Sequence, residues 1–157
     1  DLFLNLRSAL RLFGDPALPL RLAVRRLNAL VISAKVRLHP DFIWESVEPK
    51  IRAALLDAFG FARRELGQDA RSSECLSVIQ AQAGVVFADL DIFDAVTEEA
   101  TRGQLAALGT SLTLQHRIRA LKAERVKVTG RALVIRPAEL AYLSSLPDTL
   151  LLTELPR

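Results

Sequence analysis

The chain has 157 residues, half of them hydrophobic, and this length favours one domain with room for a hydrophobic core. Its net charge of +3 is unevenly spread: residues 1–39 hold seven Lys or Arg and two acidic residues, residues 40–100 five and twelve, and residues 101–157 nine and four. The acidic middle argues against a uniformly basic nucleic-acid-binding protein. No apolar run is long enough to predict a helix that spans a membrane.

These charge blocks have two interpretations that the sequence leaves open. The blocks either pair within the fold or attract a second copy or a partner, since opposite patches set register and encounter rate. The chain begins at Asp1 and contains no Met, so we expect a fragment or a processed product. The single Cys75 excludes an internal disulfide and a multi-cysteine metal site. A small buried hydrophobe is the favoured role for Cys75.

The first forty residues predict a helix and two strands. Apolar residues recur at helical spacing over residues 2–13, and Gly14 followed by Pro16 ends this amphipathic helix. Leucine and valine alternate with other residues from position 18 to 25, which predicts a strand with Pro19 at its start or on an edge. A second alternation over residues 30–39 is the clearest strand pattern, and its outward face is basic.

Two helices and a strand are expected next. Apolar residues at intervals of three and four predict a long helix from about Trp44 to Leu66. Ser73 is the natural N-cap of a second helix that runs through Gln80. The following residues 85–91 predict a strand, with Val86, Ala88, Leu90 and Ile92 on one face and Asp89, Asp91 and Phe93 on the other.

Asp89 and Asp91 form the best carboxylate pair in the sequence. Two residues apart on a strand, they lie roughly 7 Å from each other on one face, a spacing that suits a cation or acid–base chemistry. We favour cross-strand pairing with Lys35, Arg37 or an arginine of the first strand instead. His39 lacks a second His or Cys at ligand spacing, so a strand-end histidine is favoured over a metal ligand.

The C-terminal part predicts a connecting segment followed by a small β-rich extension. Residues 94–123 lose the strand pattern, with a short helix expected over residues 98–108. A hairpin is expected over residues 125–135, then a helical turn over residues 138–143. The apolar stretch at residues 149–155 resembles a strand that pairs either within the chain or with another subunit. The expected units are therefore residues 1–93, 94–123 and 124–157.

Several stretches together resemble one known family. They are residues 53–61 (AALLDAFGF), Leu66-Gly67-Gln68, Ser73-Glu74 with Val78-Ile79-Gln80, and Gly84-Val85-Val86 with Asp89-Leu90-Asp91. This order resembles the C-terminal part of baseplate J-like proteins, the wedge components of contractile phage tails and phage tail-like contractile injection systems. His39-Pro40-Asp41 and residues 136–140 (RPAEL) fit the same pattern. The resemblance covers residues 18–93 and, more loosely, residues 125–143.

The resemblance implies a structural protein of a virion-like particle. Wedge copies pair, join in a ring around a hub, and link the hub to the sheath, so the implied partners are other baseplate subunits. Assembly of the particle in the bacterial cytoplasm is implied as well. The family supplies no active site, and we expect no enzyme activity, no catalytic residues, no cofactor and no metal. The expected mechanism is mechanical, with the wedge passing a rearrangement of the ring to the sheath.

We expect an α+β fold, a small mixed sheet packed against helices in a β-α-α-β unit, with a C-terminal hairpin and strand extension. The candidate protein–protein interaction surface comprises Arg21, Arg25, Lys35, Arg37, Asp89, Asp91, Leu150 and Leu152. One alternative is a nucleic-acid-binding domain that uses the basic strand face, although this face lacks the aromatic residues on which bases stack. A second is a small-ligand enzyme that uses Asp89 and Asp91, without a phosphate loop or a catalytic triad in support.

Overall fold

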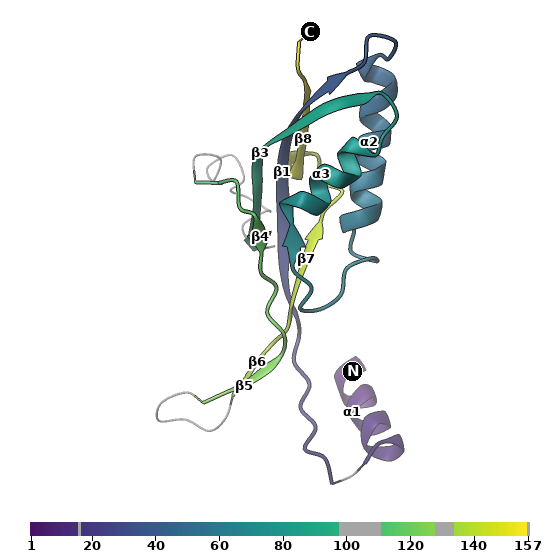
Figure 1. Cartoon of the computed structure of the whole chain (residues 1–157). Helices are drawn as coiled ribbons and strands as arrows, with labels where there is room; N and C mark the ends of the chain where they lie inside the picture. The colour runs from purple at the N-terminus through teal and green to yellow at the C-terminus, as the bar shows by residue number, and fades with distance from the viewer. Residues whose placement is uncertain (16, 98–110, 128–133, 157) are drawn as a thin grey trace.

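The computed structural model describes residues 1–15, 17–97, 111–127 and 134–156. Its elements, in chain order, are α1 (Leu2–Phe13), β1 (Arg26–Leu38), α2 (Trp44–Phe59), β2 (Ala70–Arg71), α3 (Ser72–Gln80), β3 (Val85–Thr97), β4 (Arg117–Ile118), β5 (Glu124–Val126), β6 (Val134–Arg136), β7 (Glu139–Leu143), the 3-10 turn η1 (Pro147–Thr149) and β8 (Leu150–Glu154). The expected α+β class is confirmed, and β1, α2, α3 and β3 form the β-α-α-β unit (Figure 1).

The long strand β1 is the centre of the main sheet. It pairs antiparallel with β3 from Asn28 to Leu38. On its other side it pairs in parallel with β7 over residues 26–30 and with β8 over residues 32–36. Thus β7 and β8 lie end to end along one strand, separated by η1. The two short ladders β2–β4 and β5–β6 lie outside this sheet.

The helices α2 and α3 cover one face of the sheet, and the core lies between them and β1 (Figure 1). On α2, residues four apart are buried, which explains the apolar stripe in the sequence: Val47, Ile51, Leu55 and Phe59. Phe59 meets Phe93 of β3 edge to face, with ring centroids 6.5 Å apart. A smaller cluster of Ala29, Val31 and Val96 lies apart from this core.

The predicted strand over residues 18–25 is wrong. These residues form no strand, and Leu18 and Val24 are each 67% exposed. The reason is that a strand needs a neighbour for its backbone groups. The ladder to β7 begins at Arg26, where the Arg26 N–H donates to the Ala138 carbonyl (2.9 Å). The chain therefore has one long first strand instead of two.

Both helices begin or end away from the expected residues. The long helix ends at Phe59 instead of Leu66, because Gly60 becomes extended and bridges Leu143 of β7. The second helix begins at Ser72, and its N-cap is Arg71 instead of Ser73. A contact with the first turn of the helix favours this start, since the Arg71 N–H donates to the Glu74 carboxylate (3.3 Å).

The strand after α3 begins where expected but has a different pattern of faces. Gly84 has φ +93°, a conformation that favours glycine, and a Cβ there would lie 2.5 Å from the Phe42 ring. The register of β1 and β3 shifts between Ser33 and Ala34 and again near Leu38. The first shift leaves Asp91 without a register partner and turns Phe93 to the helix-covered face, so the prediction that Phe93 shares a face with Asp89 is wrong. The strand continues to Thr97.

The C-terminal part contains a hairpin and two further strands. The expected hairpin is confirmed as β5 and β6, whose turn lies outside the described residues. The expected helical turn over residues 138–143 is wrong, since β1 offers an edge and these residues form β7. Of the two alternatives for the last strand, pairing within the chain is observed. The helix expected over residues 98–108 lies outside the described residues.

Candidate interaction surface

The charged residues predicted on the sheet lie on the face opposite the helices. Lys35 is paired in register with Asp89, and the Lys35 Nζ donates to Asp91 Oδ1 at 2.7 Å. This hydrogen bond and the charge of Asp91 raise the pKa of Lys35 above its usual value. The expected cross-strand pairing of the two aspartates is therefore confirmed for Lys35. Because the pair is exposed, its contribution to stability is small.

Arg37 and Arg25 both lie over aromatic rings. The Arg37 guanidinium carbon is 6.0 Å from the centre of the Phe87 ring on β3. The guanidinium carbon of Arg25 is 4.8 Å from the Phe61 ring, and Phe61 meets Tyr142 edge to face at 5.6 Å. These contacts place the two arginines at different parts of the molecule, one beside β3 and one beside β7.

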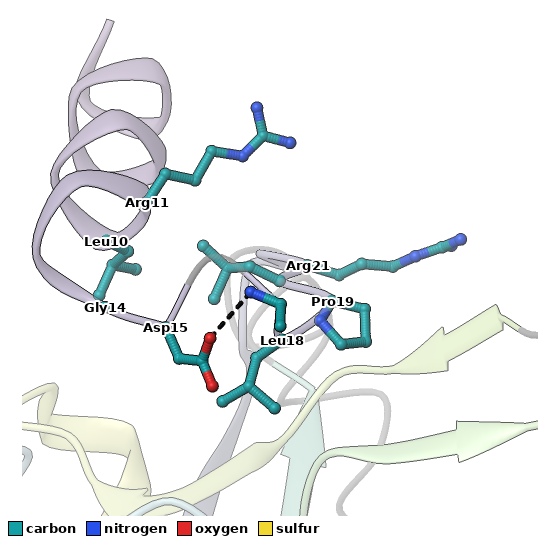
Figure 2. Close-up of a pocket in the computed structure, with 9 residues that line it drawn as sticks. Leu10, Arg11, Gly14, Asp15, Leu18, Pro19 and Arg21 are labelled. Carbon is teal, nitrogen blue, oxygen red and sulfur yellow. Dashed lines mark hydrogen bonds between the residues drawn. The ribbon is translucent and has the colours of Figure 1, made fainter.

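Arg21 lies in the extended segment before β1, beside α1. Figure 2 shows it with Leu10 and Arg11 of α1 and with Leu18 and Pro19, which together line a groove. At the end of the groove the Ala17 N–H donates to the Asp15 carboxylate (2.9 Å). The structure therefore separates Arg21 from Lys35 and Arg37, with which it was grouped as one basic face.

The two predicted leucines of the last strand lie in the core. Leu150 is 2% exposed and Leu152 is 8% exposed, and both belong to the cluster between the sheet and the helices. Their side chains point to the helix-covered face because they alternate with Leu151, which is 60% exposed. The prediction that Leu150 and Leu152 belong to an interaction surface is therefore wrong. A continuous apolar run does not reveal which face of the strand is buried.

Two polar clusters were missed in the sequence. The first surrounds Asp69, whose carboxylate accepts the Ala120 N–H at 2.9 Å and the Arg117 Nε–H at 2.6 Å. Beside it, the Arg64 side chain is 4% exposed, donates to the Asp69 carbonyl at 2.5 Å and lies over the Phe59 ring. The cluster joins the loop after α2 to β4 and the residues that follow it.

The second cluster surrounds Asp94, a buried residue on β3 with 8% exposure. Its carboxylate accepts the Ala95 N–H (2.8 Å), the Thr113 N–H (2.9 Å) and the Gln115 side-chain amide (2.6 Å). These bonds hold the segment 111–115 against β3. No local pattern predicts the role of either aspartate, because the partners that each joins to its segment are about 20 to 50 residues away in the chain.

The residues around Cys75 and the histidines offer little reactive chemistry. Cys75 is buried on α3, and this burial raises the pKa of its thiol to about 12. His39 contacts the Asp41 carboxylate at 3.2 Å in the turn before α2. Within the part of the chain that the structure describes, no three His, Cys, Asp or Glu residues are grouped so that they could hold a metal ion.

Comparison with known proteins gives no relative from which a function can be transferred. No family model matches the chain. No curated protein and no solved structure matches it either. Among the described residues, none of the helices has the length and apolar character needed to cross a membrane. The function is therefore argued from the residues and their arrangement.

Cys75 is expected to be unreactive in the folded protein. At about pH 8 a thiol with a pKa near 12 holds almost no thiolate, and the surrounding core also blocks access. A disulfide reagent that releases a coloured thiolate should therefore label the native chain slowly. In guanidinium chloride the same reagent should label one thiol per chain at once. Equally fast labelling of the native protein would contradict the buried position of Cys75 on α3.

The stability of the protein is expected to fall in acid partly through Asp69. The Ala120 N–H and then Arg117 hold the pKa of Asp69 below its usual value of 3.8. A carboxylate whose pKa is depressed in the folded state contributes stability that is fully present above about pH 4. This contribution is lost as the pH falls through the folded-state pKa. Urea unfolding at a series of pH values should therefore show that the free energies of unfolding of the wild type and of Asp69→Asn converge in acid.

The matched variant for this test is Arg117→Met. Its acid-dependent loss should be smaller than that of the wild type, because Arg117 is the second cause of the depressed pKa of Asp69. Parallel stability curves for the wild type and Asp69→Asn from about pH 6 to pH 2 would contradict the assignment.

Proposed function

We propose that this chain is a structural wedge component of the baseplate of a contractile phage tail-like injection particle. In this role it contributes to ring assembly and to the connection between hub and sheath, with other baseplate subunits as partners. The particle is assembled in the bacterial cytoplasm. The role requires protein–protein contacts and no catalysis, and it leaves the chain without cofactors.

The observation that carries the proposal is where the residues of the resemblance lie. They occupy one packed unit: residues 53–61 form the second half of α2 and its end, Ser73 to Gln80 lie in α3, and Gly84 to Asp91 form the turn and the first part of β3. Gly67 and Gly84 both have positive φ, at +74° and +93°. The pattern therefore covers two helices, the start of a strand and the glycine turns that follow the helices, and this single packed unit supports a structural role.

The basic face offers weaker support for nucleic-acid binding. Lys35 is hydrogen-bonded to Asp91, and Arg37 lies over Phe87. Arg21 and Arg25 lie in the segment before β1, away from these two residues. A cationic surface that binds the phosphate backbone normally presents its charges together. The pair Asp89 and Asp91 likewise offers the enzyme alternative little support, because Asp91 is bonded to Lys35.

The proposal is tested in the bacterium that encodes the chain. An affinity tag on the chain should co-sediment with sheathed particles seen by negative-stain electron microscopy. Deleting the coding region should remove sheathed particles, and a plasmid copy should restore them. A matched control plasmid carries Phe59→Asp, which places a charge in the core and should fail to restore assembly. Normal numbers of contractile particles in the deletion strain would overturn the proposal.

A further inference from the structure

The segment before β1 has the features of a strand that lacks a sheet. Residues 18–25 alternate apolar and other side chains, yet they form no strand. The helix α1 lies against this segment along the groove of Figure 2. We call α1 and the following residues, 1–25 in all, the arm. In Figure 1 the arm extends from the end of β1, away from α2 and α3.

The arm exposes a large apolar surface. No residue of α1 is buried, and the exposed fractions of Leu2, Leu12 and Phe13 are 78%, 76% and 86%. A 12-residue helix of this kind is marginal by itself in water and is normally stabilised by packing. The arm is thus a helix with a strand-like segment beside it, the same two-layer arrangement as α2 with the sheet.

The strand β8 provides an open edge for such a segment. Within the described ranges it pairs with β1 alone. The Leu155 N–H donates to the Val36 carbonyl at 2.8 Å, and strand backbone groups alternate in direction, so those of Leu152 and Glu154 point outward. The carbonyl of Leu150 also points outward, where it accepts the Arg52 guanidinium (3.2 Å). Leu152 and Glu154 therefore present backbone donors and acceptors at the edge that no other described strand uses.

The opposite edge of the sheet is less suitable. Two register shifts interrupt β3, and bulges of this kind protect an edge from pairing. Near its end, the Phe93 N–H donates to the Thr113 carbonyl (3.2 Å), and the Phe93 carbonyl accepts the Gln115 N–H (3.0 Å). By contrast, β8 pairs with β1 in continuous register over all five of its residues.

We propose that the arm of one copy of this chain adds its residues 20–24 to the β8 edge of a second copy. We place the two segments antiparallel, for two reasons. Leu20 and Leu22 are half-buried beside Phe3 and Leu4 of α1, whereas the residues next to them are exposed, so we place both leucines on the α1 side of the segment, as Leu152 lies on the α2 side of the sheet. In an antiparallel pair, residues that bond to each other share a face, so Leu20 and Leu22 bond to β8. Pro19, which lacks an N–H, then points outward.

The two segments also carry opposite charge, although Arg21 and Glu154 project from opposite faces of the proposed pair. The β8 edge has two exposed carboxylates, Asp148 before it and Glu154 at its end, whereas the arm carries Arg21 and Arg25 next to the added residues. The addition places α1 in the helix layer beside α2, where its exposed leucines become buried. This inference rests on the assembly role proposed above and gives it a physical form, in which one copy adds a strand to the sheet of another. The contact needs only copies of this chain, so it is tested without a particle.

The test compares two proline variants of the full chain by light scattering across a range of concentrations. Leu22→Pro removes a backbone donor that the proposed pair uses, and Ala23→Pro removes a donor that points away from it. The wild type is expected to self-associate. Leu22→Pro should raise the dissociation constant about tenfold or more, because it removes a strand hydrogen bond and disturbs the geometry of the pair. Ala23→Pro should leave the dissociation constant unchanged. Neither residue lies in a helix or strand of its own chain.

A variant of the edge completes the design. Leu151→Lys adds a positive charge at a 60% exposed position of β8 and should weaken the association, as lysine does on natural edge strands. Amide hydrogen exchange should be slow at Leu152, Glu154 and Leu22 only at concentrations where copies associate. A strictly monomeric wild type would overturn the inference, and so would equal association of Leu22→Pro and Ala23→Pro. A monomer would leave the particle test of the proposed function unaffected, so the two failures are distinguishable.

Discussion

Replacing Phe59 by Ala is expected to lower the free energy of unfolding by about 3–5 kcal/mol. Phe59 is 1% exposed, ends the buried stripe of α2 and contacts both Phe93 of β3 and the guanidinium of Arg64. Removing the ring leaves a cavity between the helix layer and the sheet, which the surrounding structure fills only in part. Urea unfolding followed by circular dichroism measures this change, with the midpoint lowered and the slope unchanged.

The matched control is Phe61→Ala, two residues along the chain. Phe61 is 49% exposed, so its loss removes the edge contact with Tyr142 and the contact with Arg25 but opens no interior cavity. We expect a cost of about 1 kcal/mol. Similar costs for the two variants would mean that α2 does not present Phe59 to the core.

Replacing Asp94 by Ala is expected to cost about 2–3 kcal/mol. The buried carboxylate is the acceptor for two backbone N–H groups and for the Gln115 amide, and the substitution leaves these part-buried donors without their acceptor. Leaving buried donors unsatisfied costs more than the bonds themselves contribute. Urea unfolding gives the size of the loss, and hydrogen exchange locates it, since the Thr113 and Gln115 amides should exchange faster.

Asp89→Ala is the control for this prediction. Asp89 lies on the same strand but its residue is exposed, and its register partner Lys35 keeps its hydrogen bond to Asp91. A change within about 0.5 kcal/mol is expected for such a surface position. A large loss from Asp89→Ala together with a small loss from Asp94→Ala would reverse the roles assigned to the two carboxylates.

Part of the candidate surface was predicted because it depends on neighbouring strands with complementary charges. The pairing of Lys35 with Asp91 follows from two strands in one unit, each with an alternating pattern. Leu150 and Leu152 were misplaced because an apolar run is compatible with either face. Asp69 and Asp94 were missed because each becomes important through donors brought from distant segments.

The local features of this protein follow from the order of its residues alone. The repeat of three and four residues produces the buried stripe of α2, and alternation produces β1. Both patterns depend on how side chains project from a regular backbone, which is a local property. The order β1–α2–α3–β3 and the α+β class follow from them.

Which segments pair as strands depends on the tertiary fold. Residues 18–25 and β8 have comparable apolar content, yet β8 forms a strand because β1 offers it an edge. Residues 139–143 form β7 for the same reason, and bulges reverse the faces of β3 after Asp91. Backbone hydrogen bonds between strands join residues far apart in the chain, so the pattern of one segment does not contain them.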